Sequence, residues 1–302
     1  MKILITGSNG LLGQKMLADL KHDNDVDLIA TSRGENRLKD KLGYTYYSLN
    51  ICSKAEVDEC LAKFQPDVLV NTAAMTNVDS CENDKKACDD LNVEAVKYLV
   101  EACNRHNCHL VHLSTDFIFD GENGPYKEED EANPLSYYGL SKLKAEKYIL
   151  GNSNSWSIIR TVLVYGVAEE MSRSNIVLWA KSALEKGQAM KVVDDQFRTP
   201  TLAEDLAQGC IAAAKSKAQG VFNISGDDFL SVLEIIQGVA KFWKLSMDNV
   251  TVVSSTTLSQ DAKRPPRTGF VLDKAKRLLN YKPHSFQDGL AVVDQQLTAA
   301  MA

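Results

Sequence analysis

Tyr138 and Lys142 stand four residues apart in a segment of helical character, and this spacing can support proton transfer. Residues i and i+4 share a helix face, so the ammonium can approach the phenol and lower its pKa from about 10. Such a phenol can give a proton to a carbonyl oxygen that Thr115 holds by a hydrogen bond. Tyr137 competes for this role, but it is five residues from Lys142 and faces a different direction. The spacing therefore favours Tyr138.

A glycine-rich turn follows the first apolar run, KILIT at 2–6. Glycines permit a tight turn, close approach of the backbone to a pyrophosphate, and close contact between helix and strand. The helix that opens there has an N-terminus that favours an anion. The order of strand, turn and helix predicts a dinucleotide site that involves Gly7, Asn9, Gly10, Leu11, Leu12 and Gly13.

The end of the second apolar run indicates which dinucleotide binds. An NAD-binding unit is expected to have an acidic residue roughly 20 residues after the glycine turn. This chain has Ser32 and Arg33 there, which can bind a 2'-phosphate that a carboxylate would repel. We therefore expect NADP(H) in preference to NAD(H). The alternative is that Arg33 is a solvated loop residue; Arg37 could assist, but the sequence does not fix its place on the loop.

Apolar runs alternate with amphipathic helical stretches, which is the pattern of βαβ units and a parallel sheet. The pattern predicts an α/β fold with a doubly wound parallel (Rossmann) sheet. Because ligands bind at the carboxyl ends of such strands, Thr115 and the Tyr138 helix should meet in a cleft. The predicted strands are 2–6, 27–31, 67–71, 109–114, 157–162 and 220–225, and the helices lie near 11–21, 54–64, 85–107, 137–150 and 202–215.

The alternation weakens after Tyr165, which predicts a smaller C-terminal substrate domain. It should contain helices near 175–187, 232–243 and 273–279 and a short strand at 190–194. The expected NADP-binding Rossmann domain comprises residues 1–166 and about 196–228, and the substrate-binding domain about 167–195 and 229–302.

Composition excludes several classes of protein. With 302 residues, 44% hydrophobic and 25% charged, the chain is typical of a globular enzyme, and its net charge of -6 disfavours a nucleic-acid partner. The opening apolar run is too short for a signal peptide or a membrane span, which predicts a cytoplasmic protein without a membrane partner. Seven cysteines without a Cys-x-x-Cys pair indicate no disulfide framework and no zinc site.

Three histidines, His106, His109 and His112, lie around the start of the fourth predicted strand, where we expect the inactive edge of the sheet. Their spacing of three residues does not fit one strand face. We therefore expect no metal site; Mg²⁺ is not indicated by the sequence, and a homodimer is left open.

The chain resembles the extended short-chain dehydrogenase/reductases, and among them the dTDP-4-dehydrorhamnose reductase family. The resemblance implies hydride delivery to the keto group of a nucleotide-linked sugar, with Thr115, Tyr138 and Lys142 as the catalytic triad. The segments that carry it are GSNGLLG (7–13), VNTAAMTNVDSCE (70–82), LSTDFIFDG (113–121), PLSYYGLSKLKAE (134–146), IIRTVLVYG (158–166) and DQFRTPT (195–201).

The same resemblance implies further site residues. Asp116 and Asn92 should lie near the site, the strand that holds Arg160 should lead to the sugar-nucleotide cleft, and Arg264 should contact the diphosphate. Other expected cofactor contacts are Asn50, Ile51, Ala73, Ala74 and Thr76, together with Tyr138 and Lys142, of which Lys142 should bind the nicotinamide-ribose hydroxyls.

Two departures from the family pattern fall on the substrate side. Leu163 stands where the family commonly has an aromatic residue, and Arg198 where it commonly has a small one. Both leave the identity of the sugar open. An epimerase or dehydratase is an alternative that the missing acidic residue near Arg33 disfavours. Another is a non-catalytic role, because the regulatory subunit of methionine adenosyltransferase looks like these reductases, and the intact triad argues against it.

Overall fold

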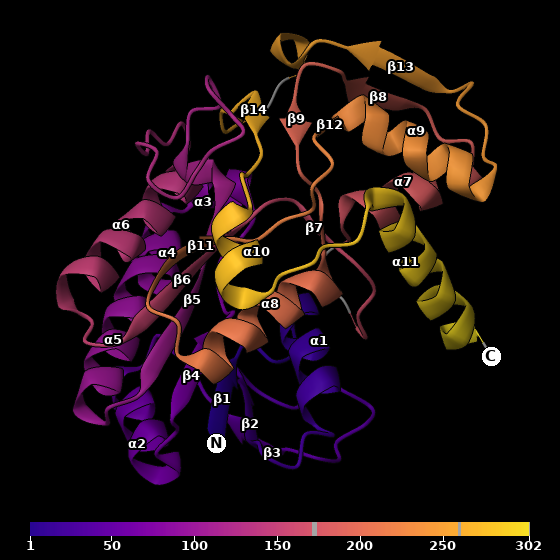
Figure 1. Cartoon of the computed structure of the whole chain (residues 1–302). Coiled ribbons are helices and arrows are strands. Elements are labelled where there is room, and N and C mark those ends of the chain that lie inside the picture. Colours follow the sequence, from indigo (N-terminus) through magenta and orange to yellow (C-terminus); the bar gives the residue numbers. More distant parts are fainter. Residues whose placement is uncertain (171–173, 259–260, 302) are drawn as a thin grey trace.

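The computed structural model describes residues 1–170, 174–258 and 261–301. Its main element is a seven-stranded parallel sheet in the order β11-β6-β5-β4-β1-β2-β3 (Figure 1). The strand order proceeds toward one edge of the sheet from β1 and toward the other edge from β4, which creates a crevice at the carboxyl ends of these two strands. The prediction of a doubly wound parallel α/β sheet is confirmed. The strands are β1 (Lys2–Thr6), β2 (Asp27–Ser32), β3 (Thr45–Ser48), β4 (Val68–Asn71), β5 (His109–Thr115), β6 (Trp156–Thr161) and β11 (Gly220–Asn223).

The expectation of six strands was wrong, because β3 forms the edge of the sheet next to β2. Its sequence, TYYS, is partly exposed and has no alternation of apolar and polar residues that would signal a strand. It has a role near the cofactor crevice: the Tyr46 hydroxyl donates to the carbonyl oxygens of Gly34 (2.7 Å) and Ser32 (3.3 Å). These bonds hold the loop that carries Arg33.

Helices cover both faces of this sheet (Figure 1). Side-chain caps mark where two of them begin: Ser53 accepts from Glu56 N, and Ser136 from Gly139 N. One layer consists of α1 (Leu11–Leu20), α8 (Ala203–Ser216) and α10 (Asp273–Leu279), and the other of α2 (Lys54–Phe64), α5 (Ala95–Arg105) and α6 (Tyr137–Asn152).

The placement of α10 corrects the predicted division of the chain. We expected this helix in the substrate domain, but Ala275 and Leu279 lie in the same buried core as the sheet residues Ile159 and Phe222. The apolar face of α10 contacts α8 and β11, and only the tertiary structure brings these elements together. The remaining domain boundaries stay a prediction.

The single helix expected near 85–107 is interrupted. The chain forms α3 (Val78–Asn83), α4 (Lys85–Asp89), a π-helical turn (Asp90–Glu94) and then α5. The Asp84 side chain accepts from Ala87 N and so caps α4. A π turn inside a helix is often found at a functional site.

A second group of elements surrounds its own core beside the carboxyl end of the sheet (Figure 1). Its helices are α7 (Ile176–Glu185), α9 (Val232–Trp243) and α11 (Phe286–Met301), with β8 (Met190–Val193) parallel to β13 (Val250–Val253). Helix α9 begins with a capping box in which Ser231 and Glu234 bind each other's backbone amides. Short strands connect the two parts: β7 (Val164–Tyr165), β9 (Phe197–Arg198), β10 (Thr201–Leu202), β12 (Leu230–Ser231) and β14 (Arg267–Thr268). Within the described ranges, we find no helix with the length and apolar character needed to cross a bilayer.

Candidate active site

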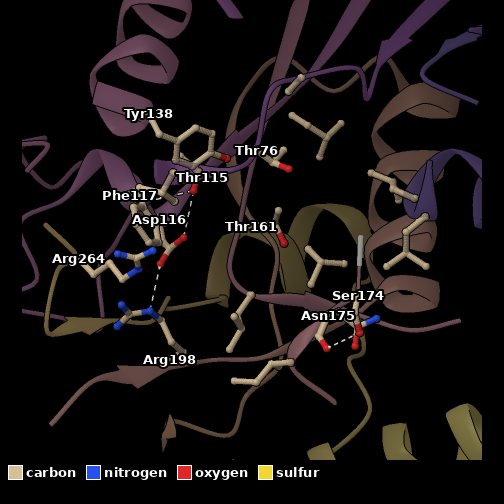
Figure 2. A pocket seen from close by; sticks show the side chains of 18 of the residues that line it. Thr76, Thr115, Asp116, Phe117, Tyr138, Thr161, Ser174, Asn175, Arg198 and Arg264 are labelled. Carbon is tan, nitrogen blue, oxygen red and sulfur yellow. Dashed lines mark hydrogen bonds and ion pairs between the residues drawn. The ribbon is translucent and has the colours of Figure 1, made fainter. Parts of the chain in front are cut away.

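A cavity of about 770 Å³ lies where the carboxyl ends of the strands face α7 and β8. Figure 2 shows Tyr138, Thr115 and Asp116 near one another in it, with Arg198 and Arg264 next to Asp116. Many predicted site residues line it: Asn9, Gly10, Leu11, Leu12, Ala74, Thr76, Thr115, Asp116, Tyr138, Lys142, Leu163, Arg198 and Arg264. Their convergence on one cavity makes it the candidate active site.

The remaining predicted cofactor residues are not among those that line this cavity, and two of them shape the glycine turn. Gly7 has φ +68°, and a Cβ on Gly13 would lie 2.7 Å from the Cα atom of Ser8. Both positions therefore require glycine. The others are Ser32, Arg33, Asn50, Ile51 and Ala73, which lie near the ends of β2, β3 and β4.

The loop after β2 closes over the glycine turn through Asn9. Its side-chain amide donates to Glu35 O (2.9 Å), and its Oδ1 accepts from Arg37 N (3.1 Å). Arg33 itself is exposed to solvent on this loop. The guanidinium of an exposed arginine on this loop is accessible to a phosphate group.

Tyr138 reaches the cavity from the first turn of α6. Its ring meets Phe117 edge to face at 5.8 Å, and the side chain is buried. We expected a lowered pKa, and this was wrong: burial raises the pKa of the phenol, while a hydrogen bond with Thr115 opposes the rise. A phenol with a raised pKa is fully protonated at neutral pH, and so it is ready to act as an acid.

Lys142 is buried one helical turn after Tyr138, and its Nζ lies 3.1 Å from His112 Nε2. Burial lowers the pKa of this lysine to about 8, and the charge of Glu146 opposes that shift. From its place in the sequence we had expected His112 at the inactive edge of the sheet. Its contact with Lys142 shows that this expectation was wrong. The spacing alone did not show that residue 112 is far enough along β5 to reach α6.

Asp116 follows Thr115 and is fully enclosed. Its Oδ1 accepts from Thr115 Oγ1 (3.1 Å), and its Oδ2 accepts from Thr268 Oγ1. Burial raises the pKa of this carboxyl, and Arg198, 3.9 Å away, opposes the rise. The carboxyl is thus a fixed polar group beside the hydroxyl of Thr115.

Arg198 has most of its donors engaged within the protein. Its guanidinium donates to the carbonyl oxygens of Phe197 (2.7 Å), Pro266 (3.2 Å) and Pro265 (2.7 Å). Arg264, in the same loop, pairs with Asp79 at 2.7 Å and keeps 20% of its side chain exposed. Arg198 therefore fixes the loop that presents Arg264 to the cavity.

Two buried hydroxyls that the sequence analysis did not single out fit a bound dinucleotide. Ser8 Oγ and Ser114 Oγ are buried and make no hydrogen bond within the described ranges. Ser8 belongs to the glycine turn, and Ser114 lines the cavity. Buried hydroxyls normally have a partner, so a polar ligand would satisfy these two. Ser8 lies within the glycine motif and Ser114 is adjacent to Thr115, and these positions were the signal in the sequence that could have identified the two residues.

Asn92, which we expected near the site, supports it through hydrogen bonds to two neighbouring segments. Its Oδ1 accepts from Met75 N (2.8 Å), and its Nδ2 donates to Met75 O (3.0 Å) and Ser141 Oγ (3.0 Å). The π turn projects this side chain between the loop that follows β4 and helix α6. Asn92 thus fixes the loop of Ala74 and Thr76 relative to the tyrosine helix.

Leu163 lines the cavity between β6 and β7 with φ +40°, a conformation that is strained for a leucine. This backbone turn directs the chain from the sheet into the second group of elements. Across the described ranges, no group of three or more His, Cys, Asp or Glu side chains could hold a metal ion.

The family profile described as the RmlD substrate binding domain matches residues 1–299. The chain belongs to this family. Its predicted resemblance to the dTDP-4-dehydrorhamnose reductases, which are NAD(P)-dependent oxidoreductases, is confirmed at the level of the family.

Individual relatives of this RmlD-family chain are matched over most of their length. The dTDP-4-dehydrorhamnose reductase of Aggregatibacter actinomycetemcomitans is 30% identical over 302 residues, with 96% of this chain and 97% of that protein covered. The methionine adenosyltransferase 2 subunit beta of Bos taurus is 29% identical, with 87% and 78% covered. The crystal structure of a dTDP-4-dehydrorhamnose reductase from Clostridium acetobutylicum is 29% identical, with a TM-score of 0.87 over 99% of this chain and 100% of that one.

Proposed function

We propose that this protein is an NADP(H)-dependent reductase of a nucleotide-linked 4-keto-6-deoxysugar such as dTDP-4-dehydrorhamnose. The observation that carries the proposal is the group formed by Tyr138, Thr115 and Lys142 in one cavity. A protonated phenol, a neighbouring hydroxyl and a buried lysine are the groups that carbonyl reduction needs. The similarity to reductases over nearly the whole chain supports it.

Each member of the triad has a separate task in the proposal. The bound nicotinamide would supply hydride to the carbonyl carbon of the sugar. Tyr138 donates its proton to the carbonyl oxygen, to which Thr115 also donates once its hydroxyl turns from Asp116 Oδ1 to the substrate. Lys142 binds the hydroxyls of the nicotinamide ribose, and its positive charge stabilises the phenolate that Tyr138 becomes.

The cofactor is held along the carboxyl ends of β1 to β4 in this proposal. Asn9, Gly10, Leu11 and Leu12 surround the pyrophosphate at the N-terminus of α1, where unpaired amides favour an anion. The preference for NADP rests on Ser32 and Arg33. Asn50, Ile51, Ala73, Ala74 and Thr76 complete the proposed contacts.

The sugar nucleotide occupies the part of the cavity that Leu163, Asp116 and Arg264 line. The exposed part of the Arg264 side chain is available to a diphosphate. Arg198 acts in this proposal through the loop of Arg264, because its own donors already bind carbonyl oxygens.

A regulatory role is the second candidate, since subunits beta of methionine adenosyltransferase 2 are as similar to this chain as the reductases are. Such a protein would bind the dinucleotide without turnover. An epimerase or dehydratase would instead convert a sugar nucleotide without net consumption of NADPH.

The decisive experiment is NADPH oxidation with dTDP-4-dehydrorhamnose and a panel of keto-sugar nucleotides. We expect Tyr138→Phe to reduce kcat by about 10²–10⁴-fold, the usual contribution of a general acid, and to raise the Kd for NADPH by no more than about tenfold, the loss of one hydrogen bond. Tyr137→Phe is the matched control, because the hydroxyl of Tyr137 binds Asp89 at 2.7 Å outside the cavity. No turnover across the panel with tight NADPH binding would favour the regulatory role.

A further inference from the structure

His112 on β5 is a buried histidine to which the proposed mechanism gives no task. Its side chain has no exposed surface. Both ring nitrogens have partners: Nε2 lies 3.1 Å from Lys142 Nζ, and Nδ1 lies 3.1 Å from Asn71 Nδ2. A neutral imidazole can serve as a donor at one nitrogen and as an acceptor at the other.

We propose that His112 is a positioning residue that fixes Lys142 Nζ by a hydrogen bond from His112 Nε2 to the amine form of the lysine. This inference rests on the proposed role of Lys142 in the reductase. Asn71 Nδ2 can only donate, so His112 Nδ1 accepts from it and the ring proton sits on Nε2, from which it is donated to Nζ when Lys142 is an amine. Burial and the nearby lysine charge lower the pKa of His112, so the ring stays neutral whether Lys142 is an ammonium or an amine.

The partners of His112 lead into the sheet and away from solvent. Asn71 Oδ1 accepts from Thr6 Oγ1 at 2.6 Å, and both side chains are buried at the ends of β4 and β1. This series of hydrogen bonds therefore gives protons no path to water. It instead fixes the ring plane of His112 through the two strands next to the cofactor crevice.

Other groups influence Lys142 by charge. Glu146 lies on the same helix and pairs with Arg160, and Cys81 of α3 and Cys88 of α4 are near enough to act on the lysine electrostatically. Among the described residues, His112 provides the hydrogen bond to Lys142 Nζ. Loss of that bond would destabilise the buried amine and raise the pKa of Lys142.

Two variants at position 112 separate this role from a merely structural one. His112→Met removes both ring nitrogens, whereas the amide of His112→Gln can still accept or donate. We expect the basic limb of the pH profile of kcat/KM for NADPH-dependent reduction to move up by about one pH unit in His112→Met, as loss of one buried hydrogen bond would give. His112→Gln should restore the limb toward that of the wild type.

His109→Gln is the matched control, because His109 is a buried histidine of the same strand that binds Ser155 and Ser157 at 2.7 and 2.8 Å. The basic limb of the pH profile of His109→Gln should lie at the same pH as that of the wild type. A folded His112→Met variant, shown by thermal unfolding, with an unshifted limb would overturn the proposal. So would an equal shift in the His109 control.

A second measurement works without turnover, so that failure of the reductase proposal can be recognised separately. Long-range ¹H–¹⁵N spectra of the ¹⁵N-labelled free protein report which ring nitrogen of His112 carries the proton. Between pH 7 and 10 we expect the ring signals to follow the ionisation of Lys142, and Lys142→Met should abolish that change. Signals that stay constant in the wild type would overturn the role of His112, whatever the activity.

Discussion

Arg160 on β6 and Glu146 on α6 form a buried ion pair in which both carboxylate oxygens accept from one guanidinium. The Nε–Oε1 distance is 3.0 Å, and the Nη2–Oε2 distance is 2.8 Å. Arg160 Nη1 also donates to Glu128 O at 2.9 Å. The pair ties the helix of Tyr138 to the sheet, so Arg160 stabilises the site from beneath it.

Removal of one partner of this pair should be costly. Glu146→Gln keeps the shape of the side chain but leaves the Arg160 charge uncompensated, and we expect the free energy of unfolding to fall by about 3 kcal/mol. Urea denaturation measures this change. Glu94→Gln, at a partly exposed pair with Lys97, should change it by less than about 1 kcal/mol. Similar losses of unfolding free energy in both variants would contradict the conclusion that the buried pair contributes more to stability.

The lowered pKa of Lys142 predicts a pH-dependent stability. The folded protein releases this proton near pH 8, whereas an unfolded lysine keeps it to about pH 10.4. Between these values the unfolded state binds more protons, so the contribution of Lys142 to the free energy of unfolding rises with pH. Relative to Lys142→Met, the wild type should gain about 2 kcal/mol from pH 7 to pH 10.

The control for this pH dependence is Lys147→Met, an exposed position on the same helix. Its unfolding free energy should run parallel to that of the wild type across the range. If the unfolding free energy of Lys142→Met also runs parallel to that of the wild type, burial does not lower the pKa of Lys142. The protonation state described for this lysine would then be wrong.

Gly139, the neighbour of Tyr138, should tolerate no side chain. A Cβ there would collide with the backbone oxygen of Phe117, in the turn that follows Thr115. Gly139→Ala should therefore displace the tyrosine helix, with a loss of about 1–3 kcal/mol in stability and a lower kcat. Gly151→Ala, in the same helix with open space around it, should be neutral or stabilising by up to about 1 kcal/mol. Steady-state kinetics and thermal unfolding distinguish the two.

Cofactor preference tests Arg33. We expect Arg33→Ala to raise the KM for NADPH about tenfold, as the loss of one charge-assisted contact would, and to leave that for NADH unchanged. Arg277→Ala, on the exposed face of α10, is the matched control. An unaltered ratio of NADPH to NADH efficiency would refute the proposed recognition of the 2'-phosphate.

The sheet was predictable from sequence because most of its strands are buried apolar runs flanked by amphipathic helices. Strand β3 was missed because an edge strand with exposed tyrosines lacks that pattern. The interruption at Asp90–Glu94 was missed because its residues suit an α-helix as well as a π turn. The convergence of Thr115, Tyr138 and Lys142 on one cavity could be predicted from their spacing and from the ends of the strands that precede them.

The sequence by itself determined the Rossmann sheet, the glycine turn and the tyrosine–lysine pair, since these depend on local periodicity and on residues close in the chain. Tertiary structure alone decided the electrostatics. Burial raises the pKa of Tyr138 where the helical spacing had suggested the reverse, and His112 meets Lys142 across 30 positions of the chain. Solvent exclusion and contacts between distant segments arise only when strands and helices assemble, because no local pattern encodes them.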